Sequence, residues 1–127
     1  MLATRFRAVA LALTAALPAT PAVADLQLLM FERPGCTFCM QWDREVGQAY
    51  PQSPEGQAAP LLRAWIKDPL PEGITLNRPA AYTPTFVLLK DGREESRIEG
   101  YPGADFFWGL IGRMLKEAGA DYTPPEI

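Results

Sequence analysis

Residues 26–50 read LQLLMFERPGCTFCMQWDREVGQAY, and this stretch decides the fold. Residues 26–31 are apolar apart from one glutamine, which is typical of a strand buried on both faces of a sheet covered by helices. A Pro-Gly pair at 34–35 ends this strand. Residues 36–50 are expected to form a helix, because apolar side chains recur there at a spacing of four. These apolar residues are Phe38, Trp42 and Val46.

The two cysteines of the chain, Cys36 and Cys39, are separated by two residues, and four kinds of site have this spacing. A structural zinc site needs about four cysteine or histidine ligands, and the chain has no histidine. Covalent haem attachment needs a histidine directly after the second cysteine, where this chain has Met40. A purely structural disulfide stays open, although so short a loop restricts the unfolded chain only weakly. A redox-active pair is favoured, because the motif lies between a strand and a helix.

Redox chemistry would use the two sulfur atoms differently. Disulfide exchange proceeds by attack of a thiolate on sulfur and passes through a mixed disulfide. Cys36 is predicted to attack, since unpaired backbone N–H groups at the start of a helix favour its thiolate. Cys39, almost one helical turn further on, is predicted to resolve the mixed disulfide. Thr37 and Phe38 influence the balance of dithiol and disulfide, and the motif alone does not choose between a reductant and an oxidant.

The remainder of the chain predicts three more strands and one more helix. The strands cover 61–67, 85–89 and 94–99, with a tight Asp-Gly turn between the last two. The connections at 50–60 and 68–81 are expected to be irregular, because both are rich in residues that end regular structure. The last helix opens at Asp105 and ends at Gly119, with one apolar stripe. The stripe consists of Phe106, Phe107, Leu110, Ile111, Met114 and Leu115.

Residues 1–24 are predicted to be a cleaved secretory signal peptide. Arg5 and Arg7 form a positive start, an apolar run follows, and a small-x-small cleavage site precedes Asp25. The apolar run is about half of the ~20 residues that a membrane span needs, so no stable membrane insertion is expected after cleavage. Residues 25–120 are predicted to be one domain and 121–127 a loose tail. A formal net charge of −3 provides no basic surface for nucleic acid.

The sequences CTFC at 36–39 and YTPT at 82–85 together resemble the active-site segments of the thioredoxin superfamily. In that family a proline after a small residue, just before a core strand, is cis and faces the redox disulfide. The resemblance implies this role for Pro84 and leaves the Thr83 backbone free to pair with an extended partner segment. It also implies a three-layer α/β thioredoxin fold, in a shortened plan close to glutaredoxin, with a mixed four-stranded sheet flanked by helices.

A closer resemblance covers almost the whole mature chain. The segments MFERPGCTFCMQWDREVGQAYP, EGQAAPLLR, YTPTFVLLKDGRE and RIEGYPGADFFWGLI are similar to the small periplasmic thioredoxins of the SoxS family. The resemblance implies a periplasmic thiol–disulfide oxidoreductase, without a metal or organic cofactor, that keeps a SoxYZ-type sulfur carrier active as a reductant. It also implies a membrane electron donor of the DsbD or CcdA kind. Substrate contacts are expected at Thr37, Phe38, Thr83, Pro84, Gly100 and Tyr101. A disulfide-donating oxidant and a binding module with a structural disulfide remain as alternatives.

The sequence departs from thioredoxin six residues before the first cysteine, where thioredoxin carries a buried aspartate that acts in proton transfer. Met30 stands there, so removal of the proton from Cys39 must rely on water or another group. Glu32 is a candidate for that group, although its position at the end of a strand is also typical of a carboxylate that is simply solvated. The paired-glycine glutathione site of glutaredoxin is not clearly present. The acidic residues Glu94, Glu95 and Glu99 are expected to form a solvated strand face.

Overall fold

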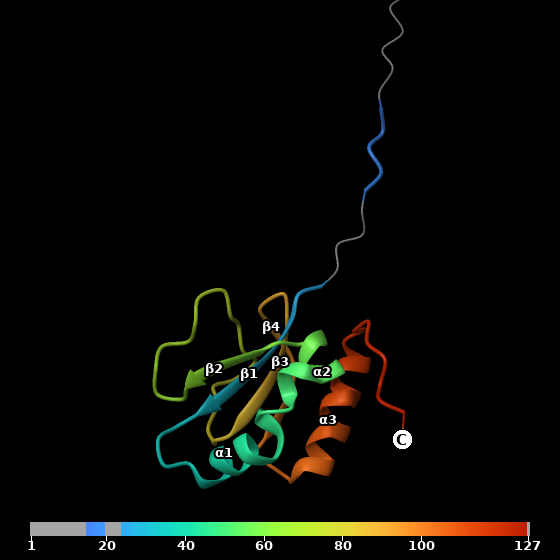
Figure 1. Ribbon diagram of the computed structural model, residues 1–127. Coiled ribbons are helices and arrows are strands. Elements are labelled where there is room, and N and C mark those ends of the chain that lie inside the picture. Colours follow the sequence, from blue (N-terminus) through green and yellow to red (C-terminus); the bar gives the residue numbers. More distant parts are fainter. Residues whose placement is uncertain (1–14, 20–23, 127) are drawn as a thin grey trace, which may run out of the picture.

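The computed structural model describes residues 15–19 and 24–126 of the 127-residue chain. Four strands form one sheet in the order β2-β1-β3-β4 (Figure 1). β1 pairs in parallel with β2 and antiparallel with β3, and β3 pairs antiparallel with β4, so the sheet is mixed as predicted. The strands are β1 (Leu26–Glu32), β2 (Leu61–Trp65), β3 (Thr85–Lys90) and β4 (Arg93–Glu99). The two central strands are the most apolar, because both of their faces are covered.

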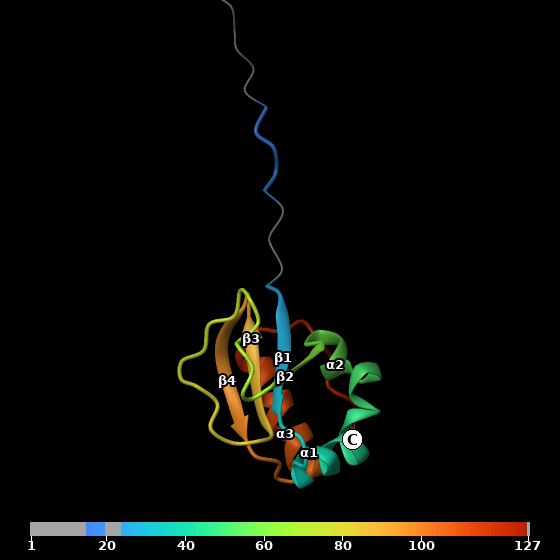
Figure 2. The ribbon, with the colours of Figure 1, turned by 90° about the vertical axis from the view of Figure 1, so that its left-hand side faces the viewer.

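The sheet separates two clusters of buried side chains, one on each face. Successive residues of a strand point to opposite faces, so Leu28 and Met30 join one cluster, while Leu29 and Phe31 join the other. The helices of the described chain pack on the first face, and the irregular segment 68–81 runs over the second (Figure 2). The predicted three-layer α/β plan is therefore confirmed, and its third layer is an irregular segment.

The residues after Cys36 form a helical segment whose geometry changes along its length. α1 (Thr37–Trp42) continues as the π-helical stretch η1 (Asp43–Gly47), and the 3-10 turn η2 (Tyr50–Gln52) follows. The predicted helix is present, and of the three apolar residues at a spacing of four, Trp42 and Val46 are buried while Phe38 is 58% exposed. Cys39 takes its place in the core, because a stripe through Cys39 and Trp42 also follows helical spacing.

The prediction of a loop at 50–60 was wrong in part, because one helical turn, α2 (Pro54–Ala58), lies within it. The Ser53 hydroxyl accepts a hydrogen bond from the backbone N–H of Gly56 at 2.9 Å, and Pro54 occupies the first helical position. Serine before proline is a start signal for a helix as well as a loop signal. A side chain at Gly56 would collide with the Tyr50 carbonyl, so the turn packs closely against η2.

The β3–β4 hairpin and the last helix follow the prediction closely. Asp91 and Gly92 have φ of 51° and 78°, as a two-residue type I′ turn requires. α3 (Ala104–Glu117) turns its apolar face to the sheet. Its buried residues are Phe107, Ile111, Met114 and Leu115. The expected place of Phe106 in this stripe was wrong, because it lies about 100° around the helix from Phe107 and is 72% exposed.

The bounds of the predicted domain, 25–120, and of the loose tail, 121–127, stay predictions. Within the tail, Tyr122 contacts α3, and its hydroxyl donates a hydrogen bond to the Gly112 carbonyl at 3.3 Å. Of the predicted signal peptide at 1–24, residues 1–14 and 20–23 lie outside the described residues, so it stays a prediction. Across 15–19 and 24–126, no helix is both long and apolar enough to cross a bilayer.

A buried ion pair holds the third layer against β4. Arg97 donates a hydrogen bond to Glu94 at 2.5 Å, and the two side chains are 6% and 2% exposed. Arg97 also donates to the carbonyls of Arg78 and Pro79, at 2.7 and 3.4 Å. The expectation of a solvated face was wrong for Glu94. Leu88 pairs with Ser96 and Leu89 with Glu94, so Glu95 has no register partner on β3. Residues three apart in a regular strand face opposite sides, and this irregularity lets residues 94 and 97 face the same side.

Replacing Arg97 with alanine should lower the free energy of unfolding by about 3 kcal/mol, because the variant leaves the buried Glu94 carboxylate without its counter-ion. Urea denaturation followed by tryptophan fluorescence measures the loss. Arg78→Ala is the matched control: its pair with Glu99 is largely exposed, and such pairs contribute at most about 1 kcal/mol. Equal losses in the two variants would contradict the structural role of the buried pair.

The same pair should make stability depend on pH. Hydrogen bonding from Arg97 is the main cause that lowers the pKa of Glu94 below its ordinary value. The pair therefore contributes fully to the free energy of unfolding above the pKa of a glutamate in the unfolded chain. This contribution is lost as the pH falls through the lower pKa of Glu94 in the folded protein. The stability difference between the parent and Arg97→Ala should shrink on acidification, which urea titrations across the acid range would measure. An undiminished difference below the folded pKa would refute this linkage.

Candidate active site

Three segments of the chain meet at one end of the sheet. Phe31 of β1 lies opposite Thr85 of β3, and Thr85 lies opposite Glu99 of β4. The residues that follow β1, precede β3 and follow β4 therefore share this end. A hydrogen bond of 2.8 Å from the backbone N–H of Gly100 to the Pro84 carbonyl joins two of the segments. The topology thus brings the two cysteines to the same end as the Thr83–Pro84 and Gly100–Tyr101 segments.

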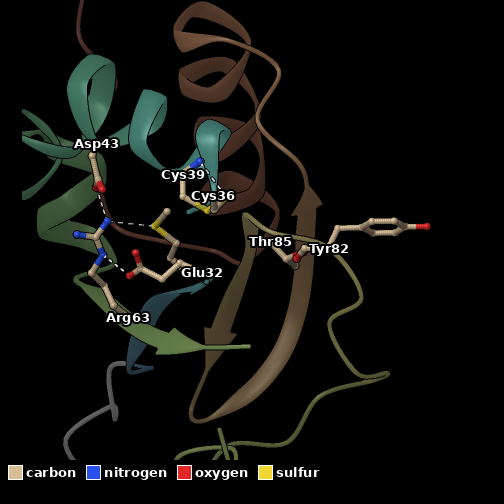
Figure 3. The surroundings of a disulfide bond; sticks show 8 residues. Glu32, Cys36, Cys39, Asp43, Arg63, Tyr82 and Thr85 are labelled. Atoms are coloured by element: carbon tan, nitrogen blue, oxygen red, sulfur yellow. Dashed lines mark hydrogen bonds and ion pairs between the residues drawn. A yellow bond between two sulfur atoms is a disulfide. The ribbon is translucent and has the colours of Figure 1, made fainter. Parts of the chain in front are cut away.

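Cys36 and Cys39 form a disulfide at the start of α1 (Figure 3). Cys36 is the N-cap residue with an extended backbone, and Cys39 lies in the first turn. Their Cα atoms are 5.2 Å apart. The backbone N–H of Cys39 donates to Cys36 Sγ at 3.2 Å. A donor directed at sulfur stabilises negative charge there, so the geometry favours Cys36 as the thiolate after reduction.

The two intervening residues form the protein surface next to the disulfide. Cys36 and Cys39 are buried, at 4% and 3% exposure, whereas Thr37 and Phe38 are exposed. Both residues were expected to contact substrate, which stays a prediction, and both are exposed beside the disulfide.

The turn before β3 has the conformation that the sequence predicted. The Thr83–Pro84 peptide bond is cis, and Pro84 is buried. The hydroxyl of Thr85 donates to the Tyr82 carbonyl at 2.7 Å, and the exposed Tyr82 ring points away from the sheet (Figure 3). The Thr83 hydroxyl is buried and has no hydrogen-bond partner among residues 15–19 and 24–126. Tyr82 and Thr83 line a surface cavity together with Arg33, so this turn lies close to the segment that leads to Cys36.

Tyr101 ties the loop after β4 to the helical segment after the cysteines. Its hydroxyl donates to Glu45 Oε2 at 2.5 Å, and Gln41 donates to the other carboxylate oxygen at 2.9 Å. The bond from Tyr101 and then that from Gln41 lower the pKa of Glu45. Burial, followed by the bond to Glu45, raises the pKa of Tyr101. Sequence reasoning missed Glu45, because no local pattern links residues 56 positions apart.

A cluster of charges beside the disulfide was also missed by sequence reasoning. Met30, in place of the aspartate of thioredoxin, is completely buried. Arg63 is its register partner on β2, and the Arg63 guanidinium lies 3.6 Å from Met30 Sδ. The guanidinium also pairs with Glu32 at 2.8 Å and with Asp43 (Figure 3). Glu32 is therefore an ion-paired carboxylate, with 16% of its side chain exposed.

A Cys-x-x-Cys disulfide at a strand–helix junction, at the same sheet end as a cis-proline turn, is the arrangement of a thiol–disulfide oxidoreductase with a thioredoxin fold. In the part of the chain that the structure describes, no group of three or more histidine, cysteine, aspartate or glutamate residues is placed to hold a metal ion.

Comparison with solved structures agrees with this class. The periplasmic thioredoxin SoxS from Paracoccus pantotrophus, crystallised in its reduced form, is 52% identical to this chain with a TM-score of 0.72, and the match covers 73% of this chain and 98% of that one. The chain therefore belongs to the SoxS-like periplasmic thioredoxins of the thioredoxin superfamily. Thioredoxin-2 of the malaria parasite shares the fold, at 17% identity and a TM-score of 0.51 over 75% of this chain and 88% of that one. No protein-family model and no curated protein matches.

Proposed function

We propose that this protein is a periplasmic reductant that keeps the cysteine of a partner protein, a SoxYZ-type sulfur carrier, in its active thiol form. The observation that carries the proposal is the hydrogen bond from the Cys39 backbone N–H to Cys36 Sγ, which supports Cys36 as the attacking thiolate. The 52% identity to a periplasmic thioredoxin supports the compartment. The signal peptide predicted at 1–24 is consistent with export.

The proposed reaction moves two electrons from the Cys36–Cys39 dithiol to a disulfide of the partner. The Cys36 thiolate attacks one partner sulfur and expels the other as a thiolate, which forms a mixed disulfide. Cys39 then loses its proton and attacks Cys36 Sγ. This step releases the second partner sulfur as a thiolate and closes the intramolecular disulfide. The Met30 thioether does not act as a base for Cys39, so the proton passes to water or to another group.

The partner is proposed to bind across the three segments at this sheet end. An extended partner segment would pair with the Thr83 backbone, next to the buried Pro84. Thr37 and Phe38 supply the exposed surface beside the disulfide, and Gly100 with Tyr101 borders it from the loop after β4. A membrane protein of the DsbD or CcdA kind is proposed to restore the dithiol after each cycle.

Cys39→Ser should convert the protein into a trap for its partner. The Cys36 thiolate of this variant still attacks, but no second thiol resolves the mixed disulfide. Periplasmic extracts of cells that express the variant, run on non-reducing gels, should contain adducts that reducing agent releases. The variant lacking both cysteines is the control. Absence of adducts, together with failure of the parent protein to reduce insulin, would refute disulfide exchange and favour a structural disulfide.

The direction of exchange is tested by titrating the cysteine pair against glutathione. A reductant should have a potential below that of the glutathione couple, and a disulfide donor should lie well above it. A SoxYZ-type carrier among the trapped proteins would support the proposed partner. Adducts with other exported proteins alone would instead indicate general maintenance of periplasmic thiols.

A further inference from the structure

The charges of Glu32, Arg63 and Asp43 form one connected group, which we call the Arg63 network. Arg63 Nε binds Glu32 Oε2 at 2.8 Å, and one terminal nitrogen of the guanidinium binds Asp43 Oδ1. The guanidinium carbon also lies 5.8 Å from the centre of the Trp42 ring. The Arg63 and Asp43 side chains are 42% and 40% exposed, so the network lies at the protein surface with Glu32 at its buried end.

Two contacts of Arg63 connect it to the surroundings of the disulfide. Met30, whose sulfur accepts a hydrogen bond from Arg63 at 3.6 Å, belongs to the same buried cluster as Cys36 and Cys39. Asp43 lies one helical turn beyond Cys39, and its backbone N–H donates to the Cys39 carbonyl. Figure 3 shows the disulfide and the Arg63 network in one view, with the Arg63 guanidinium directed at Glu32 and Asp43. The network therefore contacts the buried cluster that contains the two cysteines.

A reduced Cys-x-x-Cys pair with Cys36 ionised carries a negative charge that the disulfide does not have. A net positive charge nearby stabilises this reduced form and makes the couple more oxidising, and a net negative charge does the opposite. Arg63 alone would stabilise the thiolate. With its two carboxylates, the network instead carries a net charge of −1 at neutral pH.

We propose that Glu32 and Asp43 are positioning residues that neutralise Arg63 beside the dithiol and thereby keep the redox couple reducing. The inference deepens the proposed function, because it assigns the direction of exchange to particular side chains. It also gives Arg63 two roles: it anchors β2 to the helical segment, and it limits the negative charge that the carboxylates would otherwise place beside Cys39. The network contacts Met30, which stands where thioredoxin has its buried aspartate.

The test measures the equilibrium of each purified full-length variant with reduced and oxidised glutathione. Glu32→Gln and Asp43→Asn should each shift it about threefold toward the dithiol, which is about 14 mV for a two-electron couple. Arg63→Gln should shift it about threefold toward the disulfide, because it leaves two carboxylates without their cation. The double variant Glu32→Gln/Arg63→Gln restores the net charge, so its equilibrium should return close to the parent value.

These opposite signs separate an electrostatic role from a structural one. A structural role would make the double variant at least as perturbed as either single variant. Glu117→Gln, at the far end of α3, removes one exposed negative charge and is the control for overall charge. Shifts of the same sign in the carboxylate and arginine variants, or shifts no larger than that of the control, would overturn the proposal. If Glu32→Gln does not fold, the shift of the glutathione equilibrium in Asp43→Asn tests the role of the carboxylates by itself.

The ionisation of Cys36, followed by thiolate absorbance against pH, is the second measurement. Glu32→Gln should move the ionisation to lower pH, and Arg63→Gln should move it to higher pH. These readouts need no partner protein. A parent potential well above that of glutathione would sink the proposed reductant function, whereas opposite shifts in the two variants would still uphold the role of the Arg63 network.

Discussion

Cys36→Ser should reduce disulfide exchange to the uncatalysed background. The serine hydroxyl forms no disulfide, and the backbone N–H that would stabilise a thiolate is directed at position 36 and not at Cys39 Sγ, so Cys39 does not replace the missing nucleophile. The Cys39 backbone N–H would then donate to an oxygen atom that takes no part in the reaction. Insulin reduction with dithiothreitol as the electron source measures the loss, and the expected rate is that of dithiothreitol alone.

The comparison with Cys39→Ser distinguishes catalysis from a structural disulfide. Both variants lose the disulfide, so a structural role predicts similar losses of stability and similar behaviour towards partners. Disulfide exchange instead predicts that Cys39→Ser still forms a mixed disulfide in one turnover, whereas Cys36→Ser forms none. Mixed-disulfide formation by Cys36→Ser at the rate of Cys39→Ser would contradict the assignment of the nucleophile.

Phe107→Ala should lower the free energy of unfolding by about 3–5 kcal/mol. Phe107 has no exposed surface and packs against Phe86 and Trp42, with ring centres 4.9 and 5.7 Å away. It therefore connects α3 with β3 and with α1, and its removal leaves a cavity where all three elements meet. A domain of this size has a total stability of about 5–15 kcal/mol, so the variant would be marginal at 37 °C.

Phe106→Ala is the matched control for this prediction, since the neighbouring ring is 72% exposed. Its effect should stay within about 0.5 kcal/mol, as for most surface substitutions. Thermal unfolding followed by circular dichroism should place the Phe107→Ala midpoint at least about 12 °C below that of Phe106→Ala. Equal midpoints for the two alanine variants would mean that Phe107 does not bridge the layers as described.

Local signals predicted the parts of the fold that depend on backbone chemistry close in sequence. The Asp91-Gly92 turn was predictable because those residue types accept positive φ, which the hairpin needs. The helix start at Cys36 was predictable because a Pro-Gly pair ends the preceding strand. The α2 turn was missed, since the same Ser53-Pro54 pair is compatible with a loop and with a helix start. In the structure this turn packs closely against the Tyr50 carbonyl.

The burial of individual side chains was predicted less well, because helical periodicity identifies an apolar stripe but does not show which of its residues are buried. Phe38 and Phe106 fit an apolar pattern and are exposed at the end of the sheet where the candidate site lies. Glu94 fits an exposed edge strand and is buried, because the irregular segment covers that face. For Glu94 the deciding contacts come from a segment distant in sequence, because its partner Arg97 bonds to the carbonyls of Arg78 and Pro79, and no local pattern reports these contacts.

The sequence by itself determined the reacting pair. Two cysteines at this spacing after a strand, in a chain without histidine, leave disulfide chemistry or a structural bond, and the Thr83-Pro84 pair before a core strand favours the first. Tertiary structure alone decided what surrounds the pair. Parallel pairing of β1 with β2 places Arg63 beside Met30, and the helical segment brings Asp43 to the same guanidinium. The physical reason is range: backbone preferences act within a few residues, whereas the charges and apolar contacts around Cys36 and Cys39 come from strands and helices that only the complete fold brings together.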